Sequence, residues 1–166
     1  MKNLWMLRFD SPETRKILSN FIDSSEFSLG LVTSNHLNEK YVRDLIQTSK
    51  ATELLNSVDL ILPDMENLNY DEEVIFDDKY YYYAQQIMDR NETKVGNLSF
   101  SDRNLLLIAQ TSFWKQKLEN NRPDVVVFSV VPHFYYELVL VALLREEGIP
   151  CIFLFQAVGR SHMFLD

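Results

Sequence analysis

The chain has 166 residues and is poor in the residue types that announce a function directly. Its single cysteine, Cys151, cannot form an internal disulfide and suits a reducing compartment. Its four glycines form none of the motifs of dinucleotide-binding oxidoreductases, P-loop NTPases or ordinary α/β hydrolases. Its three histidines belong to no metal-ligand cluster. The sequence therefore disfavours these classes, and we expect neither a bound metal nor a cofactor.

Basic residues are also few relative to acidic ones. Sixteen Lys and Arg stand against twenty-four Asp and Glu, which gives a formal net charge of −8. A general nucleic-acid binder needs a basic surface that displaces counterions, so no nucleic-acid partner is expected. Seven of the acidic residues lie between Asp64 and Asp78, without the ligand spacing of a calcium loop. We interpret this segment as a solvated loop.

Long apolar runs are missing as well. The longest, residues 125–128 and 138–144, are far shorter than the roughly eighteen residues of a membrane span, so no span is expected. The amino terminus reaches Arg8 and Asp10 after only a short apolar stretch, unlike a signal peptide. These features predict a cytoplasmic location.

The apolar residues that are present, 46% of the chain, alternate between strand-like and helix-like patterns. The expected strands are residues 4–9, 27–33, 58–62, 125–130 and 151–155, and the main expected helices are about residues 12–22, 38–55, 99–120 and 134–147. The run from Val125 is continuous rather than alternating, as in a strand buried on both faces. The sequence therefore predicts a single α/β domain over residues 1–166. We expect a Rossmann-like, three-layer fold with a mainly parallel sheet and helices on both faces.

Two of the expected helices carry specific signals. Ser99 and Asp102 predict a capping box at the start of the long helix. Its buried face is expected to contain Leu105, Ile108, Ala109, Ser112 and Phe113. Gly148 is expected to end the following helix in the C′ position. That helix is expected to bury Leu138, Val141, Ala142 and Leu144.

Candidate site residues follow the predicted strands, because ligands of open parallel sheets collect at the carboxyl ends of the strands. The candidates are Asp10 and Ser11 after the first strand, Ser129 and His133 after the fourth, and Gln156 and Arg160 after the fifth. If the sheet is fully parallel, all six share one rim. Asp10, Ser129, His133 and Arg160 are expected to converge there.

Asp10 and His133 are the candidate catalytic residues. His133 would lie in the first turn of a helix, where backbone N–H groups and the helix dipole favour anions. It could donate to a ligand oxygen or act as a base, or it could simply pack against the turn. Asp10 could take a proton from a hydroxyl nucleophile, or it could be an ordinary helix N-cap.

The other four candidates are assigned to ligand binding. Ser11, Ser129 and Gln156 offer hydrogen bonds, and Arg160 can bind a phosphate or carboxylate through two parallel hydrogen bonds. Plain solvation is the alternative for the residues that follow the last strand.

Residues 122–166 resemble a known family. Arg-Pro-Asp precedes an apolar strand, Pro132-His133 opens a helix, and Gly-Ile-Pro precedes the next strand, which Gln156 and Gly159-Arg160 follow. This succession resembles the N-terminal domain of bacterial capsule and surface-polysaccharide glycosyltransferases of GT-B architecture. It covers about a quarter of the chain, and the remainder agrees in the order of its elements.

The resemblance implies that the chain is one half of an enzyme. GT-B proteins have two Rossmann-like domains; the C-terminal one mainly binds the nucleotide-sugar donor, and the N-terminal one chiefly holds the glycan acceptor. It also implies no metal held by a DxD motif and little transfer by the 166 residues alone. The alternative is a non-catalytic, stand-alone Rossmann-like module that binds a small anion or a protein partner.

Overall fold

The computed structural model describes residues 1–9, 14, 16, 20, 26–34, 53–57, 59–60 and 98–154, with the backbone of 155–156 and 163–165. The chain divides into two compact units, each made of segments that are separate in the sequence. The first consists of Met1–Ser57, Arg122–Val131 and Ile149–Asp166. The second consists of Val58–Asn121 and Pro132–Gly148.

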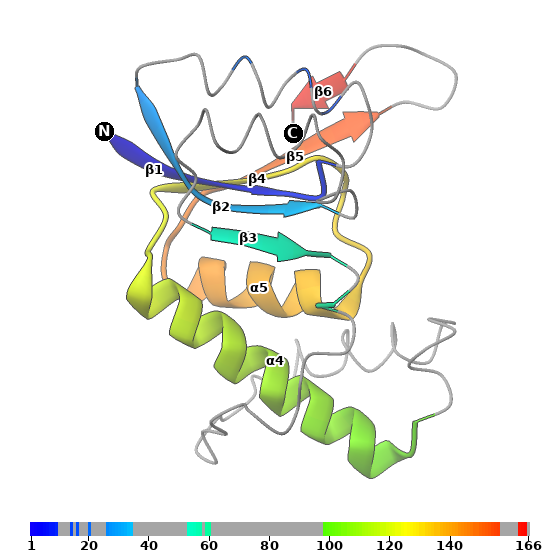
Figure 1. The fold of residues 1–166 in the computed structure, drawn as a ribbon. Coiled ribbons are helices and arrows are strands. Elements are labelled where there is room, and N and C mark those ends of the chain that lie inside the picture. The colour runs from blue at the N-terminus through cyan, green and yellow to red at the C-terminus, as the bar shows by residue number, and fades with distance from the viewer. Residues whose placement is uncertain are drawn as a thin grey trace. The chain divides into compact units, whose positions relative to one another are not determined.

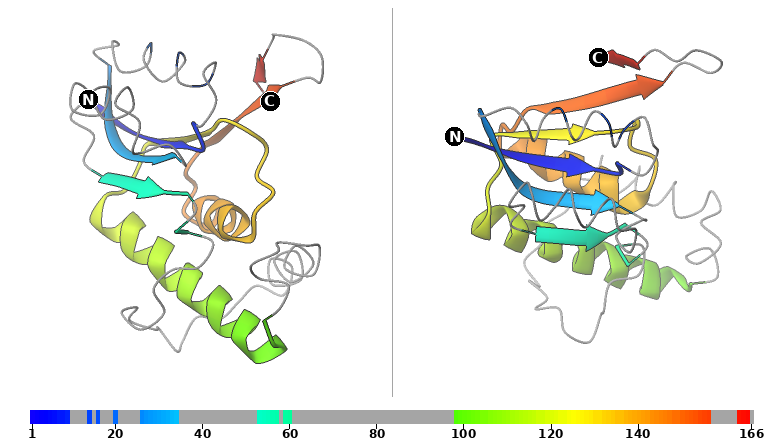
Figure 2. Two further views of the ribbon diagram at one scale, coloured as in Figure 1. Left: turned by 45° about the vertical axis from the view of Figure 1, so that its right-hand side comes forward. Right: turned by 45° about the horizontal axis from the view of Figure 1, so that its top comes forward.

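The first unit contains a mainly parallel sheet. Its strands are β1 (Lys2–Leu7), β2 (Phe27–Ser34), β3 (Glu53–Asn56), β4 (Val125–Phe128), β5 (Cys151–Gln156) and β6 (Met163–Leu165). They lie in the order β3-β2-β1-β4-β5-β6 (Figure 1). Strands β1 to β5 are parallel, as the right-hand view of Figure 2 shows, and β6 is antiparallel to β5. The α/β class is confirmed, and the order β3-β2-β1-β4-β5 is that of a Rossmann-like sheet.

The two central strands, β1 and β4, are buried on both faces. Neighbouring side chains of a strand point to opposite faces, yet Val126, Val127 and Phe128 are all at most 1% exposed. The prediction drawn from the continuous β-branched run is therefore confirmed. One face carries an apolar cluster formed by Leu4, Met6, Phe9, Leu29, Val32, Val127 and Leu154.

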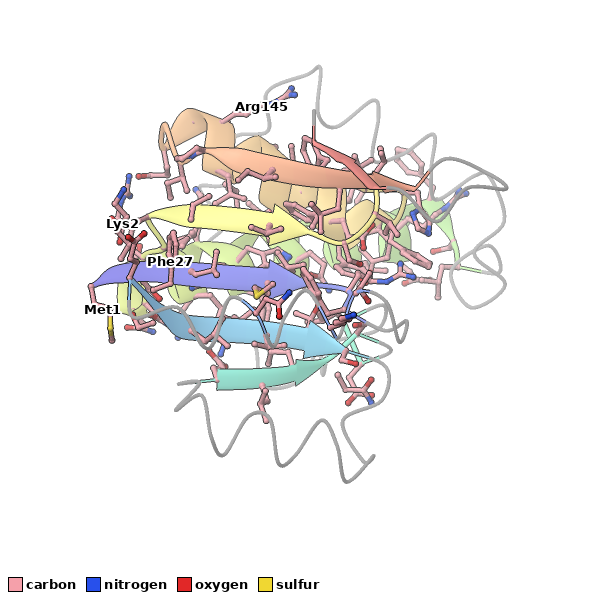
Figure 3. The ribbon with its side chains drawn as sticks, turned by 90° about the horizontal axis from the view of Figure 1, so that it is seen from above. Met1, Lys2, Phe27 and Arg145 are labelled. Carbon is pink, nitrogen blue, oxygen red and sulfur yellow. The ribbon has the colours of Figure 1, made fainter. Side chains whose placement is uncertain are left out.

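Polar contacts hold the amino end of β1 in register. The backbone N–H of Asn3 donates to Asp124 Oδ2 (2.6 Å), and Asn3 Nδ2 donates to the carbonyl of Arg122 (2.8 Å). On the other side, Lys2 is in register with Phe27 of β2. Figure 3 shows Lys2 and Phe27 together at this end of the sheet. The Arg-Pro-Asp sequence before β4 thus has a structural role.

Two strands differ from the sequence prediction. β3 covers Glu53–Asn56, where the sequence predicted a helix up to about residue 55. The strand predicted at residues 58–62 is contradicted at Asp59 and Leu60, which lie in a turn. β3 is at the edge of the strand order and pairs with β2, from Leu31↔Glu53 to Ser34↔Asn56. A half-buried edge strand has a weak apolar pattern, so its partner rather than its composition determines it. β6 is not among the predicted strands.

The second unit contains α4 (Phe100–Asn120) and α5 (Tyr135–Glu146). The Ser99–Asp102 capping box of α4 is confirmed, with Asp102 N–H donating to Ser99 Oγ (3.2 Å). Gly148 follows α5 with a φ of 66°, a left-handed conformation that glycine adopts without strain, so the predicted helix end is also confirmed. Neither described helix is both long and apolar enough to cross a membrane.

The buried face of α4 agrees with the predicted one only in part, because Ala109 and Ser112 are buried as expected while Ile108 and Phe113 are half-buried. Leu105 is 48% exposed, while its neighbour Leu106 is 1% exposed. Gln110 is fully buried because its Nε2 donates to the carbonyl of Leu60 at 2.5 Å. The buried positions of α4 occur on several sides of the helix: Leu106, Leu107, Ala109, Gln110, Thr111, Ser112, Trp114 and Leu118. An apolar stripe could not reveal Gln110 and Thr111, because both are polar and hydrogen-bonding partners decide whether such side chains are buried.

α5 packs against α4 within this unit. Trp114 Nε1 donates to the carbonyl of Tyr136 (3.1 Å), and Tyr135 Oη donates to the Leu60 carbonyl (3.4 Å). Val141, Ala142 and Leu144 of α5 are buried as predicted, whereas Leu138 is half-buried.

Candidate functional site

The sheet has a reversal point between β1 and β4. From β1 the chain adds β2 and then β3 on one side, whereas β4 and β5 are added on the other side. β1 and β4 are paired from Leu4↔Val125 to Leu7↔Phe128, so their carboxyl ends are neighbours. Ligands of open α/β sheets bind outside the carboxyl ends at such a point. The residues at and directly after these strand ends are therefore the candidate site.

Arg8, which directly follows β1, has an unusual backbone conformation. Its φ is 63°, the one described non-glycine residue with positive φ. A left-handed conformation costs an L-residue about 1–2 kcal/mol, and glycine is the usual occupant. Strain of this kind concentrates at functional sites, where the surrounding structure holds it in place.

Hydrogen bonds from both neighbouring strands hold Arg8. Its N–H donates to Thr33 Oγ1 of β2 at 2.9 Å, and its carbonyl accepts a hydrogen bond from Ser129 Oγ, just after β4. The adjacent peptide groups are also paired: Phe9 N–H donates to the Thr33 carbonyl (3.4 Å), and Ser129 N–H donates to the Leu7 carbonyl (2.9 Å). We refer to Arg8, Thr33 and Ser129 as the switch-point cluster.

Burial differs among the three members. Thr33 is fully buried and Ser129 is 1% exposed, whereas Arg8 is partly exposed. The two hydroxyl groups hydrogen-bond the backbone of Arg8, one at its N–H and one at its carbonyl. A guanidinium is always charged and presents a planar set of donors that matches phosphate or carboxylate.

Hydroxyl groups continue along the carboxyl ends toward β3. Ser34 ends β2 and Ser57 follows β3, with 1% and 2% of their surfaces exposed. Ser57 N–H donates to the Ser34 carbonyl (3.3 Å). Ser57 Oγ has no hydrogen-bond partner within the part of the chain that the structure describes. Each of β1 to β4 is therefore followed, or ended, by a side chain that can hydrogen-bond.

The sequence-predicted site residues have different outcomes. Ser129 lies where expected, at the carboxyl end of β4, and its side chain positions the Arg8 backbone. Gln156 is the last residue of β5 and pairs through its backbone with Met163, but its side chain lies outside the described residues, as do Asp10, Ser11 and Arg160. The roles and the convergence assigned to these residues stay predictions.

His133 belongs to the second unit and is exposed. Its backbone N–H donates to Glu137 Oε2 (2.8 Å), as does the N–H of Phe134 (3.0 Å). Glu137 itself is fully buried. The N–H groups of His133 and Phe134 are thus bound by a carboxylate of the chain itself rather than being available to a ligand. The His133 ring lies 4.5 Å from that of Phe134, centroid to centroid.

No family model, curated protein or solved structure matches this chain. Among the described residues, no group of three His, Cys, Asp or Glu side chains could hold a metal ion. The cluster supplies a positive charge and hydroxyls, and none of its members accepts a proton at neutral pH. It can bind an oxygen-rich or anionic ligand, while a base must come from another residue.

Sequence reasoning missed Arg8 and Thr33. Arg8 lies inside an apolar segment between Leu7 and Phe9, and an arginine interrupting a strand just before a predicted strand end is the available signal. An arginine does not predict a positive φ, because glycine, and to a lesser degree Asn and Asp, are the residues that favour this conformation.

Proposed function

We propose that this chain is the acceptor-side domain of a two-domain GT-B glycosyltransferase that acts in bacterial surface-polysaccharide synthesis. The observation that carries the proposal is the reversal of a Rossmann-like sheet between β1 and β4, with the switch-point cluster at their carboxyl ends. This is the position at which such sheets bind ligands. The resemblance of residues 122–166 supports the reaction class.

In this proposal, Asp10 or His133 is the general base. Asp10 comes two residues after Arg8, and His133 comes four residues after Ser129, so they follow two strands that are hydrogen-bonded neighbours. The base takes the proton of an acceptor hydroxyl while the oxygen of that hydroxyl attacks the anomeric carbon of the donor sugar. The bond from that carbon to the nucleoside diphosphate breaks, and the diphosphate leaves with the bonding electrons. The second domain holds the donor.

A binding experiment tests the acceptor-side assignment. Saturation-transfer NMR on the 166-residue chain would compare oligosaccharides of bacterial surface polymers with nucleotide sugars. We expect the oligosaccharides to receive saturation and the nucleotide sugars to receive little, because the donor half is a separate domain. Binding of nucleotide sugars in preference to glycans would contradict the proposal.

A turnover experiment tests the base. In a protein that also carries the donor-binding domain, Asp10→Ala or His133→Ala should lower kcat by about 10²–10⁴-fold, the usual contribution of a general base. His36→Ala is the matched control, since we assign that histidine no role. Near-normal turnover in both Asp10→Ala and His133→Ala would exclude the proposed base.

A second candidate function follows from the composition of the switch-point cluster. Arg8 and two hydroxyl groups lie there, without a carboxylate or imidazole among the three. This composition also suits a non-catalytic module that binds a small anion. Binding of inorganic phosphate with no binding of any glycan would favour this candidate.

A further inference from the structure

We infer that Thr33 and Ser129 are positioning residues, which fix the direction in which the chain leaves β1 and thereby place the candidate base Asp10. The inference rests on the proposed function for one part only, the role of Asp10 in proton transfer. Of the two candidate bases, Asp10 is the one that follows the turn after β1, since it comes two residues after Arg8.

The first support is the hydrogen bonding of the two peptide groups that flank the Cα atom of Arg8. In the preceding peptide group, the N–H donates to Thr33 Oγ1 (2.9 Å), and the Leu7 carbonyl accepts from the Ser129 N–H (2.9 Å). In the following peptide group, the Phe9 N–H donates to the Thr33 carbonyl (3.4 Å), and the oxygen accepts from Ser129 Oγ. Each peptide group is thus held at its N–H by Thr33 and at its oxygen by Ser129.

This pairing fixes the backbone angles of Arg8. A trans peptide group is planar, and its N–H and carbonyl point in opposite directions. β1 lies between β2, which contains Thr33, and β4, which Ser129 follows (Figure 2), so each peptide group is held from both sides. With both planes held, Arg8 stays at a φ of 63°, a conformation that an arginine does not favour by itself. Conformations that the surrounding structure over-determines in this way cluster at functional sites.

The second support is the burial and the chemistry of the two hydroxyl groups. Thr33 is fully buried and Ser129 is 1% exposed. A hydroxyl has a single O–H to donate, and that of Ser129 donates to the Arg8 carbonyl. It cannot donate to a ligand at the same time. The sequence predicts a ligand-binding role for Ser129, whereas its side chain acts through the turn at Arg8.

The third support is the place where the turn ends. Leu4 and Met6 lie on the face that carries the apolar cluster, and regular alternation would direct residue 8 to that same face. Instead Phe9 joins the cluster, with 1% of its surface exposed. The left-handed conformation at Arg8 is the break in alternation. The chain is therefore fixed as far as a buried ring, and Asp10 is the next residue.

Amide hydrogen exchange of the 166-residue chain tests whether the two residues hold the turn. Thr33→Val removes the side-chain acceptor of the Arg8 N–H, and Ser129→Ala removes the donor to the oxygen of the next peptide group. We expect exchange at least tenfold faster at Arg8 in the first variant and at Phe9 in the second. Exchange at Met6, within β1, should stay unchanged.

The matched control is Ser28→Ala. Ser28 Oγ also donates to a carbonyl of β1, that of Lys2 (3.3 Å), but at the amino end of the strand. We expect this variant to leave exchange at the turn after β1 unchanged. Thr33→Ser keeps the accepting hydroxyl and should exchange as slowly as the wild type.

A turnover measurement tests the link to Asp10, in a protein that also carries the donor-binding domain. We expect Ser129→Ala to lower kcat about tenfold or more while KM for the acceptor stays within about twofold, because a displaced base loses its reactive geometry. In an Asp10→Ala background, Ser129→Ala should lower kcat no further, since a residue that acts through Asp10 has no effect without it. Ser28→Ala should turn over normally.

The outcomes separate this inference from the proposed function. Unchanged exchange at the turn in both the Thr33→Val and the Ser129→Ala variant would overturn the inference, whatever the chain binds. Equal losses of kcat with and without Asp10 would also overturn it, since Ser129 would then affect stability alone. If exchange changes as expected and the wild-type two-domain protein transfers no sugar, the proposed function fails, while the positioning of the turn by Thr33 and Ser129 stands.

Discussion

Glu137 is a buried carboxylate at the start of α5, and its surroundings explain how such a group is tolerated. Its Oε2 accepts hydrogen bonds from the N–H groups of His133 and Phe134, at 2.8 and 3.0 Å. The amino end of a helix also favours a negative charge. Glu137 therefore fixes the backbone of the segment that enters α5, including that of the candidate base His133.

We predict that Glu137→Ala lowers the free energy of unfolding by about 1–3 kcal/mol, because two backbone N–H groups lose their acceptor. Glu137→Gln should cost less, since its amide oxygen can still accept. Urea denaturation measures both. Glu146→Ala, an exposed change in the last turn of the same helix, is the control and should stay within about 0.5 kcal/mol. Equal stability of Glu137→Ala and the wild type would show that the two hydrogen bonds contribute nothing.

The candidate site illustrates what residue-level reasoning can predict. Ser129 could be found from the sequence because a serine after a buried strand must lie at the carboxyl end of a parallel sheet. Arg8 could not, because its conformation depends on Thr33 and Ser129, which are 25 and 121 residues away in the chain. The residues next to Arg8 in the sequence do not indicate partners that are so distant in the chain.

At the scale of elements, α4 shows that the periodicity of apolar residues does not by itself predict which side chains of a helix are buried. The pattern predicted an apolar face containing Leu105, whereas the structure buries Leu106 and exposes Leu105. The polar Gln110 is buried in addition, because the carbonyl of Leu60 accepts its hydrogen bond. The helix ends were correct because capping residues act within one turn.

These adjacent leucines give a direct test. Leu106→Ala should lower the free energy of unfolding by about 2–5 kcal/mol, through lost burial and the cavity that remains. Leu105→Ala, the same chemical change one position earlier, should change it by no more than about 0.5 kcal/mol. Thermal or urea unfolding of the two variants measures the difference. A larger loss of unfolding free energy for Leu105→Ala than for Leu106→Ala would contradict the observed burial and favour the face predicted from the sequence.

At the scale of the whole molecule, the two compact units are interleaved along the chain. The chain passes between them after residues 57, 121, 131 and 148. The sequence indicated one domain because no linker-like composition marks these positions. Ser129 and His133 are four residues apart and yet belong to different units.

Introducing a charged side chain at a buried position of the sheet tests the core of the first unit. Val127 is 1% exposed in β4, and Val131, a few residues later, is 46% exposed. Val127→Asp should unfold the sheet, because burying an unpaired carboxylate costs several kcal/mol against a total stability of about 5–15 kcal/mol. Val131→Asp, with the same chemistry at the surface, should remain folded. Far-UV circular dichroism and amide NMR dispersion distinguish the two results, and a folded Val127→Asp variant would contradict the described core.

The sequence by itself determined the features whose causes lie within a few neighbouring residues. The cap formed by Ser99 and Asp102, the end of α5 at Gly148 and the doubly buried β4 all have local causes, and together with the strand–helix alternation they led to the α/β class. Tertiary structure alone decided the pairing of the edge strands β3 and β6, the burial of Gln110 and the left-handed turn at Arg8. Each of these depends on a hydrogen-bond partner that the fold brings near, and a partner distant in the chain leaves no trace in the local pattern.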